Sequence, residues 1–290
     1  MAAAELETRR LDSMPALPPL YAKALARSLP LIGGGGERLP EHALEVEAVA
    51  IDRDHLATYC RVCGCGLRES AVPPTYPHVL AFPLAMALMS ERSFPFPLLG
   101  LVHIANRIEQ RAPIAAGSRP TLRLWAENFR PHRRGRQLDL VTEARVDGEA
   151  VWREASTYLR RGEGGGDGGR SSRADQSARG EVAAVWSVSG DVGRRYAEVS
   201  GDRNPIHLHG LAARPFGFPG AIAHGMWMNA RCLGALEGRL PGALVASVEF
   251  RSPLRIPGQA RFRLRSEGGR YAFALESADG ERTHMVGDAG

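Results

Sequence analysis

Apolar residues recur at helical spacing in the second half of the chain, between about Ala221 and Gly238. Ile222, Met226 and Leu233 lie four and seven positions apart, as residues on one face of a helix do. Beyond this segment apolar and polar residues alternate with period two, which is typical of half-buried strands. The strands predicted there are Val245–Ile256, Ala260–Glu267 and Tyr271–Ser277.

The first half of the chain has the same order of elements. An apolar helical segment, Pro77–Met89, precedes four strand-like stretches, which are Leu101–Ile114, Thr121–Asn128, Gln137–Val146 and Ala150–Leu159. One long apolar helix followed by a run of antiparallel strands, twice over, predicts an α+β fold. In such a fold each sheet wraps around a helix.

Short matching segments indicate that the two halves arose by duplication. Tyr59–Cys65 (YCRVCGC) aligns with Tyr196–Asp202 (YAEVSGD), sharing Tyr, Val and Gly. Further along, Arg111–Ile114 (RAPI) aligns with Arg251–Leu254 (RSPL) in the same order. Two aligned segments flanking an apolar helix in each half are difficult to obtain by chance.

A glycine- and serine-rich stretch at residues 162–180 separates the halves and is predicted to be a flexible linker. We therefore expect a repeat at residues 41–161 and another at residues 181–290. Residues 1–40 form an N-terminal segment with a predicted helix at residues 17–32.

Composition favours an ordinary soluble protein. The chain has 290 residues, 44% of them apolar and 24% charged, which excludes general disorder. The net charge is +5, and Lys23 is the only lysine. The arginines are spread along the chain, whereas a nucleic-acid-binding protein clusters them. No apolar run is long enough to cross a bilayer and no secretory signal is visible, so we expect a cytoplasmic protein without nucleic acid or membrane partners.

Three of the four cysteines lie close together. Cys60, Cys63 and Cys65 could supply thiolates to zinc or an iron–sulfur cluster, but a fourth ligand at a usual spacing is missing. Reduced, unligated thiols are the favoured interpretation, also for Cys232. We expect no metal.

Polar functional groups crowd into one segment of the second half. Asp202, Asn204, His207 and His224 lie within 23 positions, and Gly201 with Pro205 indicates a tight turn between them. A carboxylate beside an imidazole can orient water and exchange protons with it near neutral pH. The simpler alternative is a turn-forming aspartate and a buried, hydrogen-bonded histidine.

His224 and Gly225 stand where the apolar helix is expected to begin. Main-chain N–H groups in a first helical turn lack partners within the helix and lie at its positive end. Glycine lets a ligand carbonyl approach such an amide, which can stabilise an oxyanion. Close packing of the helix on the sheet would also explain this glycine.

The segment S-G-D-R-N-P-I-H, followed by sixteen residues and H-G-M, resembles the MaoC-like acyl dehydratase family, also called hydratase 2 or (R)-specific enoyl-CoA hydratase. The resemblance implies a double hot-dog fold with a catalytic second repeat and a degenerate first one. Asp202 and His207 would be the catalytic pair. Gly225 would polarise the thioester carbonyl, with Asn204 and His224 assisting in substrate binding.

The first repeat lacks these groups. Our alignment places Cys65 opposite Asp202, Ser70 opposite His207, and Phe82–Pro83 opposite His224–Gly225. The second repeat itself departs from the family at His209, where many members have Asp, and we expect this residue either to cap a helix or to support the site residues from behind. Small and apolar residues of Ala81–Met89 either line an acyl-chain cavity or pack in the core.

By resemblance, the expected activity is that of a hydro-lyase of fatty acid metabolism, which reversibly hydrates trans-2-enoyl-CoA to (R)-3-hydroxyacyl-CoA. No cofactor is implied. The partner would be an acyl-CoA or acyl-carrier-protein thioester, and a homodimer is plausible. A hot-dog acyl-CoA thioesterase and a non-catalytic acyl-thioester-binding protein are the alternative hypotheses.

Overall fold

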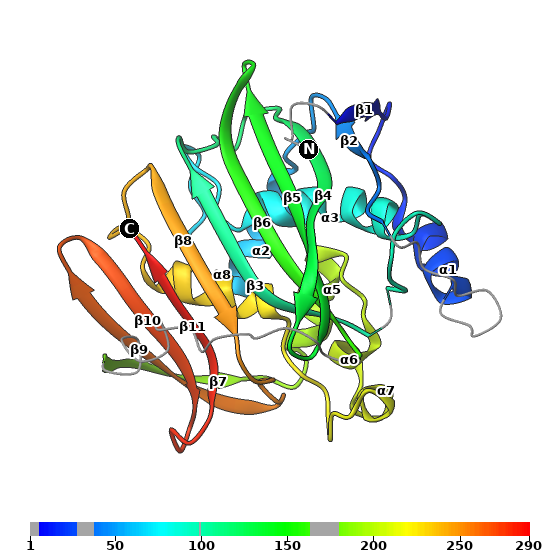
Figure 1. Cartoon of the computed structure of the whole chain (residues 1–290). Helices are drawn as coiled ribbons and strands as arrows, with labels where there is room; N and C mark the ends of the chain where they lie inside the picture. Colours follow the sequence, from blue (N-terminus) through cyan, green and yellow to red (C-terminus); the bar gives the residue numbers. More distant parts are fainter. Residues whose placement is uncertain (1–5, 28–37, 99, 163–179) are drawn as a thin grey trace.

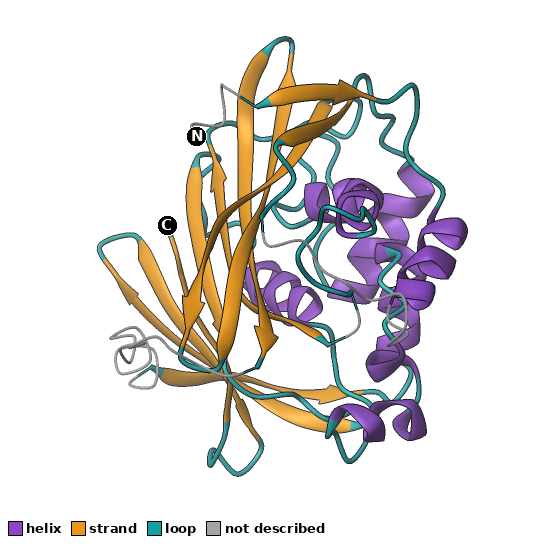
Figure 2. Cartoon of the chain, turned by 45° about the vertical axis from the view of Figure 1, so that its right-hand side comes forward, coloured by secondary structure: helices purple, strands orange, loops and turns teal. Residues whose placement is uncertain are grey.

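A computed structural model describes residues 6–27, 38–98, 100–162 and 180–290. The described strands join into one continuous sheet of eleven strands, and the helices gather on one side of it (Figures 1 and 2). The predicted α+β class is therefore confirmed.

The first repeat places two helices before four long antiparallel strands. Its elements are α2 (Arg53–Cys63), α3 (Tyr76–Met89), β3 (Leu101–Gln110), β4 (Thr121–His132), β5 (Gly135–Val146) and β6 (Glu149–Arg161). Helix α3 is the predicted apolar helix, and most of its side chains are buried.

The second repeat has the same plan with a longer connection before its central helix. Its elements are β7 (Glu181–Val188), α5 (Val192–Ser200), α6 (Pro205–Leu208), α7 (Gly210–Ala213), the 3₁₀ helix η2 (Arg214–Phe216), α8 (Gly225–Ala235), β8 (Leu244–Phe250), β9 (Gly258–Glu267), β10 (Arg270–Ser277) and β11 (Thr283–Ala289). Helix α8 is shorter at both ends than the sequence pattern predicts.

The two repeats share the sheet edge to edge. The strand order is β1-β2-β4-β5-β6-β3-β8-β11-β10-β9-β7, and the repeats meet where β3 pairs antiparallel with β8, from Ala105 opposite Glu249 to Gln110 opposite Leu244. Each repeat thus closes an edge that the other would leave open to solvent. The helices α2 and α8 also contact across this boundary, since Trp227 Nε1 donates to the carbonyl of Val62 at 2.9 Å.

The sequence pattern does not predict the two N-terminal strands. Strands β1 (Glu7–Arg10) and β2 (His42–Val46) pair in parallel and extend the sheet of the first repeat. The predicted N-terminal helix is present as α1 (Leu17–Arg27), and the residues predicted to continue it to position 32 lie outside the described ones. Most of the predicted linker, residues 163–179, also lies outside the described ones.

The first helices of the two repeats end in the same way. Helices α2 and α5 both end at a left-handed glycine, Gly64 with φ 70° and Gly201 with φ 76°, and both bury the matching tyrosine, Tyr59 or Tyr196. A left-handed residue after a helix favours glycine because it lacks a Cβ atom.

One part of our alignment is wrong. Phe82 and Pro83 lie inside α3, which begins at Tyr76 after Thr75, so Thr75–Tyr76 stands at the helix start that His224–Gly225 occupies in the second repeat. The connection at residues 64–75 is much shorter than that at 201–224. The first repeat therefore reaches the start of its central helix sooner after the shared glycine than our alignment assumes.

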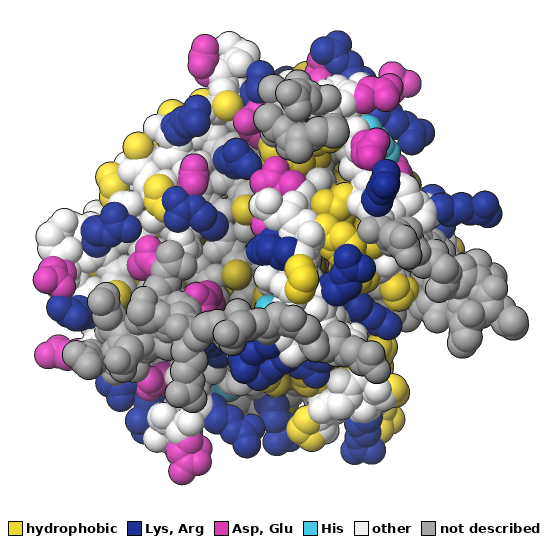
Figure 3. Space-filling model, viewed as in Figure 1, with side chains coloured by type: hydrophobic (Ala, Val, Ile, Leu, Met, Phe, Trp, Pro, Cys, Tyr) yellow, Lys and Arg dark blue, Asp and Glu magenta, His cyan; other side chains and the backbone are white. Residues whose placement is uncertain are grey.

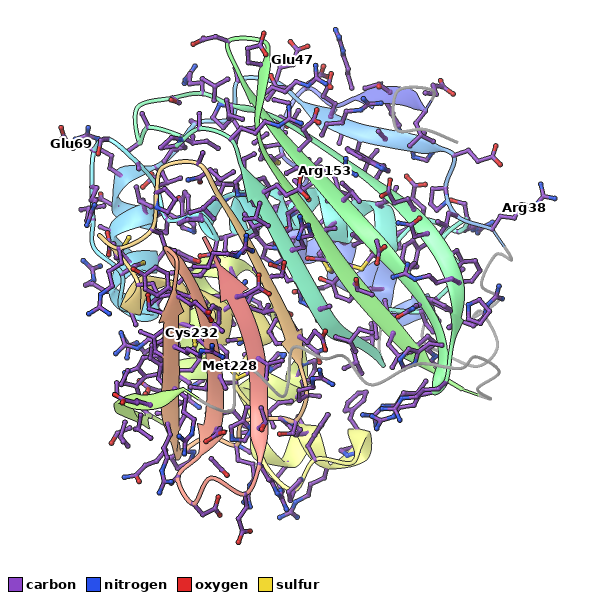
Figure 4. The ribbon with its side chains drawn as sticks, turned by 60° about the vertical axis from the view of Figure 1, so that its left-hand side comes forward. Arg38, Glu47, Glu69, Arg153, Met228 and Cys232 are labelled. Atoms are coloured by element: carbon purple, nitrogen blue, oxygen red, sulfur yellow. The ribbon has the colours of Figure 1, made fainter. Side chains whose placement is uncertain are left out.

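The four cysteines are unpaired thiols, and Cys60, Cys63 and Cys232 are buried. Figure 4 locates Met228 and Cys232 of α8 behind strands of the second repeat, where both side chains are buried. Burial raises the pKa of Cys232 well above its usual value, so this thiol stays protonated.

Arginine and acidic side chains are interspersed over the face drawn in Figure 3 rather than separated into patches. Among the described residues, no helix combines the length and apolar character needed to span a membrane.

Candidate active site

The end of α5 fixes the position of Asp202. The left-handed turn at Gly201 directs the chain away from the helix, and the Asp202 N–H donates to Ser200 Oγ at 3.1 Å. The carboxylate in turn accepts from the Asn204 N–H at 3.1 Å. Its side chain keeps 34% of its surface exposed, in the cavity described below.

Asn204 and Pro205 start the short helix α6 that carries His207. The Asn204 side chain accepts from the Ile206 N–H as an N-cap, and Pro205 occupies the first helical turn, where its missing N–H costs nothing. His207 Nδ1 lies 2.8 Å from the carbonyl of Ile222. Because a carbonyl only accepts, Nδ1 carries the proton in the neutral ring and Nε2 is left as a base.

His224 lies directly against His207. Their ring centroids are 3.7 Å apart with 28° between the planes, and the Tyr196 ring packs on His224 at 4.9 Å. His224 Nε2 donates to the main-chain carbonyl of Asp202 at 2.9 Å, which ties the start of α8 to the Asp202 turn. Its Nδ1 is buried without a hydrogen-bond partner among the described residues.

The protonation states suit acid–base chemistry. Burial lowers the pKa of His224 to about 3, with help from His207, and burial also holds the pKa of His207 below its usual value. Burial tends to raise the pKa of Asp202, but His224, His207 and the Asn204 amide outweigh it and leave that pKa below its ordinary value. At neutral pH the cluster therefore holds one carboxylate and two neutral imidazoles.

Gly225 begins α8, as predicted. A Cβ atom at this position would lie 3.0 Å from the Phe250 ring, so a side chain here would require the helix start or the ring to shift. Gly225 is the first residue of the helix, where an N–H has no partner within the helix. The His224 side chain does not cap the helix, so this positive end faces the cavity.

A metal ion is geometrically conceivable, because Asp202, His207 and His224 each offer one ligand atom and these atoms lie within 4.8 Å of one another. The two imidazoles are nearly parallel, however, and their lone pairs lie in the ring planes. One nitrogen of each imidazole is already engaged by a main-chain carbonyl, that of Ile222 for His207 and that of Asp202 for His224, which leaves one nitrogen on each ring for a further partner.

These groups line a cavity of about 640 Å³ that both repeats help to form. Asp202, Asn204, His207, His224 and Gly225 all contribute to its wall, so every predicted site residue lies on the same cavity. From α3, the apolar side chains that line it are Phe82, Met86 and Met89, whereas Leu84 and Leu88 are buried without lining it.

His209 lies beside the site but points elsewhere. Its Nδ1 accepts from the Leu211 N–H at 3.3 Å and caps α7, which is the role we expect from the sequence.

Sequence reasoning missed Tyr21 on α1. Its hydroxyl donates to the carbonyl of Gly201 at 2.6 Å and accepts from the Arg203 N–H at 2.7 Å, so it holds the main chain on both sides of Asp202. Tyr21 also lines the cavity. It is 181 positions from Asp202, and no local pattern links the two.

Both the second repeat and the chain as a whole resemble known proteins. Residues 181–286 match the family described as MaoC like domain, which covers the second repeat. The chain is 36% identical to 3-hydroxyacyl-thioester dehydratase X of Mycobacterium tuberculosis over 265 residues, which are 91% of this chain and 94% of that one. It is 43% identical to 3-hydroxybutyryl-CoA dehydratase of Methylorubrum extorquens over 67 residues, 21% of this chain and 41% of that one.

Solved structures resemble this chain over both repeats. The crystal structure of HtdX of Mycobacterium tuberculosis superposes with a TM-score of 0.76 at 35% identity, covering 86% of this chain and 99% of that one. A MaoC-like dehydratase of Phytophthora capsici shares the fold at 18% identity, with a TM-score of 0.68 over 87% and 94% of the two chains. These matches confirm the predicted double hot-dog fold. With similarity extending over nine-tenths of its length, the chain belongs to the MaoC-like dehydratase family.

Proposed function

We propose that this protein is an acyl-thioester hydratase/dehydratase, which adds water reversibly to a trans-2-enoyl thioester and forms the (R)-3-hydroxyacyl thioester. One observation carries the proposal: the Asp202 carboxylate and a nitrogen of the His207 imidazole lie within 4.8 Å of each other and share a cavity with Gly225 at the start of α8. The names of the relatives, 3-hydroxyacyl-thioester dehydratase and 3-hydroxybutyryl-CoA dehydratase, support the same class of reaction.

Asp202 and His207 would hold and activate the water. A separation below 4.8 Å lets one water bridge the two groups, accepting or donating at each end. His207 Nε2 is unprotonated in the neutral ring and can take a proton as the water oxygen bonds to C3. Because the two groups lie within 4.8 Å of each other, the oxygen that bonds to C3 and the proton that His207 returns to C2 would come from the same side, as syn addition requires.

Gly225 would stabilise the charge that develops on the thioester oxygen. In the hydration direction, attack at C3 moves electrons toward the carbonyl and forms an enolate-like oxyanion before C2 is protonated. An N–H at the positive end of α8 is well placed to receive that charge, because it needs no reorganisation when the charge forms. The Asn204 cap would keep the catalytic turn in place.

CoA is the carrier that we propose, with acyl carrier protein as the competing possibility. A homodimer is a further part of the proposal and is tested by the mass of the protein in solution. Activity needs no cofactor in this scheme, because each proton and electron pair moves between water, substrate and protein side chains.

The test is the loss of enoyl-thioester absorbance on adding the purified protein to enoyl-CoAs of increasing length, with chiral analysis of the product. Asp202→Asn and His207→Ala should each lower kcat/KM by roughly 100-fold or more, the usual contribution of a positioned acid or base. Asp147→Asn, in the β5–β6 turn, and His132→Ala, on the exposed end of β4, are the matched controls.

Two results would overturn the proposal. Release of free thiol from saturated acyl-CoA without hydration would show a thioesterase. Wild-type rates in both Asp202→Asn and His207→Ala would show that this pair is not the catalytic one.

A further inference from the structure

The first repeat contributes a cluster of polar side chains to the cavity, far in sequence from the family motif. We call this the distal cluster; it consists of His78 on α3, His103 on β3, and Glu154 and Tyr158 on β6. His78, His103 and Tyr158 line the same cavity as Asp202. The cavity wall of the first repeat is therefore not simply apolar.

A buried carboxylate favours the protonated form of His78. Its Nδ1 lies 2.8 Å from Glu154 Oε2, and the Glu154 side chain, which is 1% exposed, also accepts from Asn106 Nδ2. Burial lowers the pKa of His78, but the Glu154 carboxylate outweighs it and leaves that pKa above the usual value. Nδ1–H is given to Glu154, so Nε2–H is the donor that remains for the cavity.

His103 is turned toward the cavity by a β-bulge. The β3–β6 register slips after His103 pairs with Tyr158, because Ala105 then pairs with Thr157. Bulges of this kind re-aim side chains. The His103 ring stacks on Tyr158 at 4.7 Å, and its Nε2 is buried without a hydrogen-bond partner among the described residues. Burial and the neighbouring His78 lower its pKa to about 3, so the ring is neutral.

Phe250 connects the distal cluster to the reaction centre. Its ring centroid is 5.0 Å from that of His103, and the same ring lies against Gly225. The cluster is thus one aromatic side chain away from the amide that would bind the thioester carbonyl. An acyl chain that leaves that carbonyl along the Phe250 ring would meet the distal cluster.

A plain hydrocarbon chain would be a poor occupant here. It would displace water from two imidazole rings and a phenol without replacing their hydrogen bonds, which costs binding free energy. A site built to hydrogen-bond one substrate atom discriminates against the analogue that lacks it.

We propose that His78, His103 and Tyr158 recognise an oxygen atom on the acyl chain, so that the preferred substrates are enoyl thioesters with an oxo or hydroxyl group beyond the reacting double bond. The proposal rests on the hydratase function proposed above. The donors available are Nε2–H of His78 and the Tyr158 hydroxyl, with His103 as a further donor or acceptor.

The test compares trans-2-octenoyl-CoA with its 6-oxo and 7-oxo derivatives as substrates for hydration. We expect the better oxo substrate to have a kcat/KM at least about tenfold higher than the plain chain in the wild-type enzyme. Tyr158→Phe, which removes only a hydroxyl, should reduce that ratio by about fivefold, in line with one buried hydrogen bond. His103→Phe should reduce it similarly, and Tyr271→Phe on β10, outside the cavity, should leave the ratio unchanged.

Equal kcat/KM for plain and oxo substrates in the wild type would overturn the proposal. So would an equal fall for both substrates in Tyr158→Phe, which would assign the cluster to the fold or to the carrier. Either outcome leaves the hydratase function standing, whereas an absence of hydration with every enoyl-CoA would reject that function first.

Discussion

The imidazole of His224 stacks on that of His207 at 3.7 Å while its Nε2 binds the main-chain carbonyl of Asp202 at 2.9 Å. One side chain therefore positions both members of the proposed catalytic pair, although it belongs to a different segment. Its place immediately before Gly225 links the pair to the start of α8 as well.

His224→Phe separates stacking from hydrogen bonding. Phenylalanine keeps an aromatic ring against His207 but leaves the Asp202 carbonyl without its donor. We expect kcat for hydration to fall by about tenfold, because the Asp202 turn is less well fixed, with a stability loss of about 1–3 kcal/mol. Steady-state kinetics and denaturant unfolding measure the two effects. An unchanged kcat would show that this hydrogen bond does not position Asp202.

The depressed histidine pKa values predict an acid-tolerant enzyme. His207 must be neutral to accept a proton from water, and its folded pKa lies below the ordinary 6.5. The kcat/KM for hydration should therefore stay level from pH 8 to about 6.5 and decline only below it. An acidic limb with an apparent pKa at or above 6.5 would contradict this assignment.

The free energy of unfolding should also fall as the pH is lowered. Because His207 and His224 titrate lower in the folded state, the unfolded chain binds more protons in acid. Their contribution to the free energy of unfolding is present above about 6.5 and is lost as pH falls through the folded values. Replacing His224 by Phe should flatten part of this acid dependence, measured by denaturant unfolding at several pH values.

Tyr21→Phe tests whether the N-terminal helix is part of the active site. The variant loses hydrogen bonds to Gly201 and Arg203 on either side of Asp202. We expect kcat/KM to fall by about tenfold and stability by about 1–2 kcal/mol. Tyr271→Phe is the matched control, since Tyr271, on β10, is not among the residues that line the cavity. Equal activity of the two variants would restrict α1 to a structural role.

How far the sequence predicts the structure depends on how local each contact is. The Asp202 turn, the α6 cap at Asn204 and the helix start at Gly225 involve residues within a few positions, and local patterns indicate them. Tyr21 and His103 reach the cavity through sheet pairing and helix packing across long separations, which single-sequence patterns do not encode.

The spacing between matched residues of the two repeats is also only partly predictable from the sequence. The shared Gly64 and Gly201 place the first helices of the repeats correctly, but the connection after Gly64 is shorter. The connection after Gly201 is longer because it includes α6 and α7, and α6 carries His207. The strands β1 and β2 are short and pair only with each other and β4, so they give weak patterns.

Glu154→Gln tests the ion pair of the distal cluster. The variant leaves the His78 imidazolium without its counter-charge, so we expect a stability loss of about 2–3 kcal/mol at pH 6. Because the folded pKa of His78 is raised, this contribution is complete below the unfolded value near 6.5 and disappears as pH rises through the folded value. The difference between wild type and variant should therefore shrink at high pH.

Glu109→Gln is the control for that experiment, since Glu109 pairs with Arg107 in an exposed ion pair. Exposed pairs contribute little, so its stability should change by less than about 1 kcal/mol. A difference for Glu154→Gln that is constant with pH would show that His78 is not charged in the folded protein.

Gly225→Ala tests whether the amide at the start of α8 must keep its position for activity. The new methyl group would lie 3.0–3.2 Å from the Phe250 ring, which is tighter than ordinary contact, so either α8 or the ring must shift. We expect kcat to fall by roughly 100-fold, because a displaced amide no longer meets the oxyanion. Phe250→Leu in the same chain makes room for the methyl group and should recover a part of the loss. Gly117→Ala, where a Cβ meets nothing within 4 Å, should retain full activity. If Phe250→Leu restores nothing although the double variant is folded, the defect of Gly225→Ala lies in the approach of substrate to the amide rather than in the position of α8.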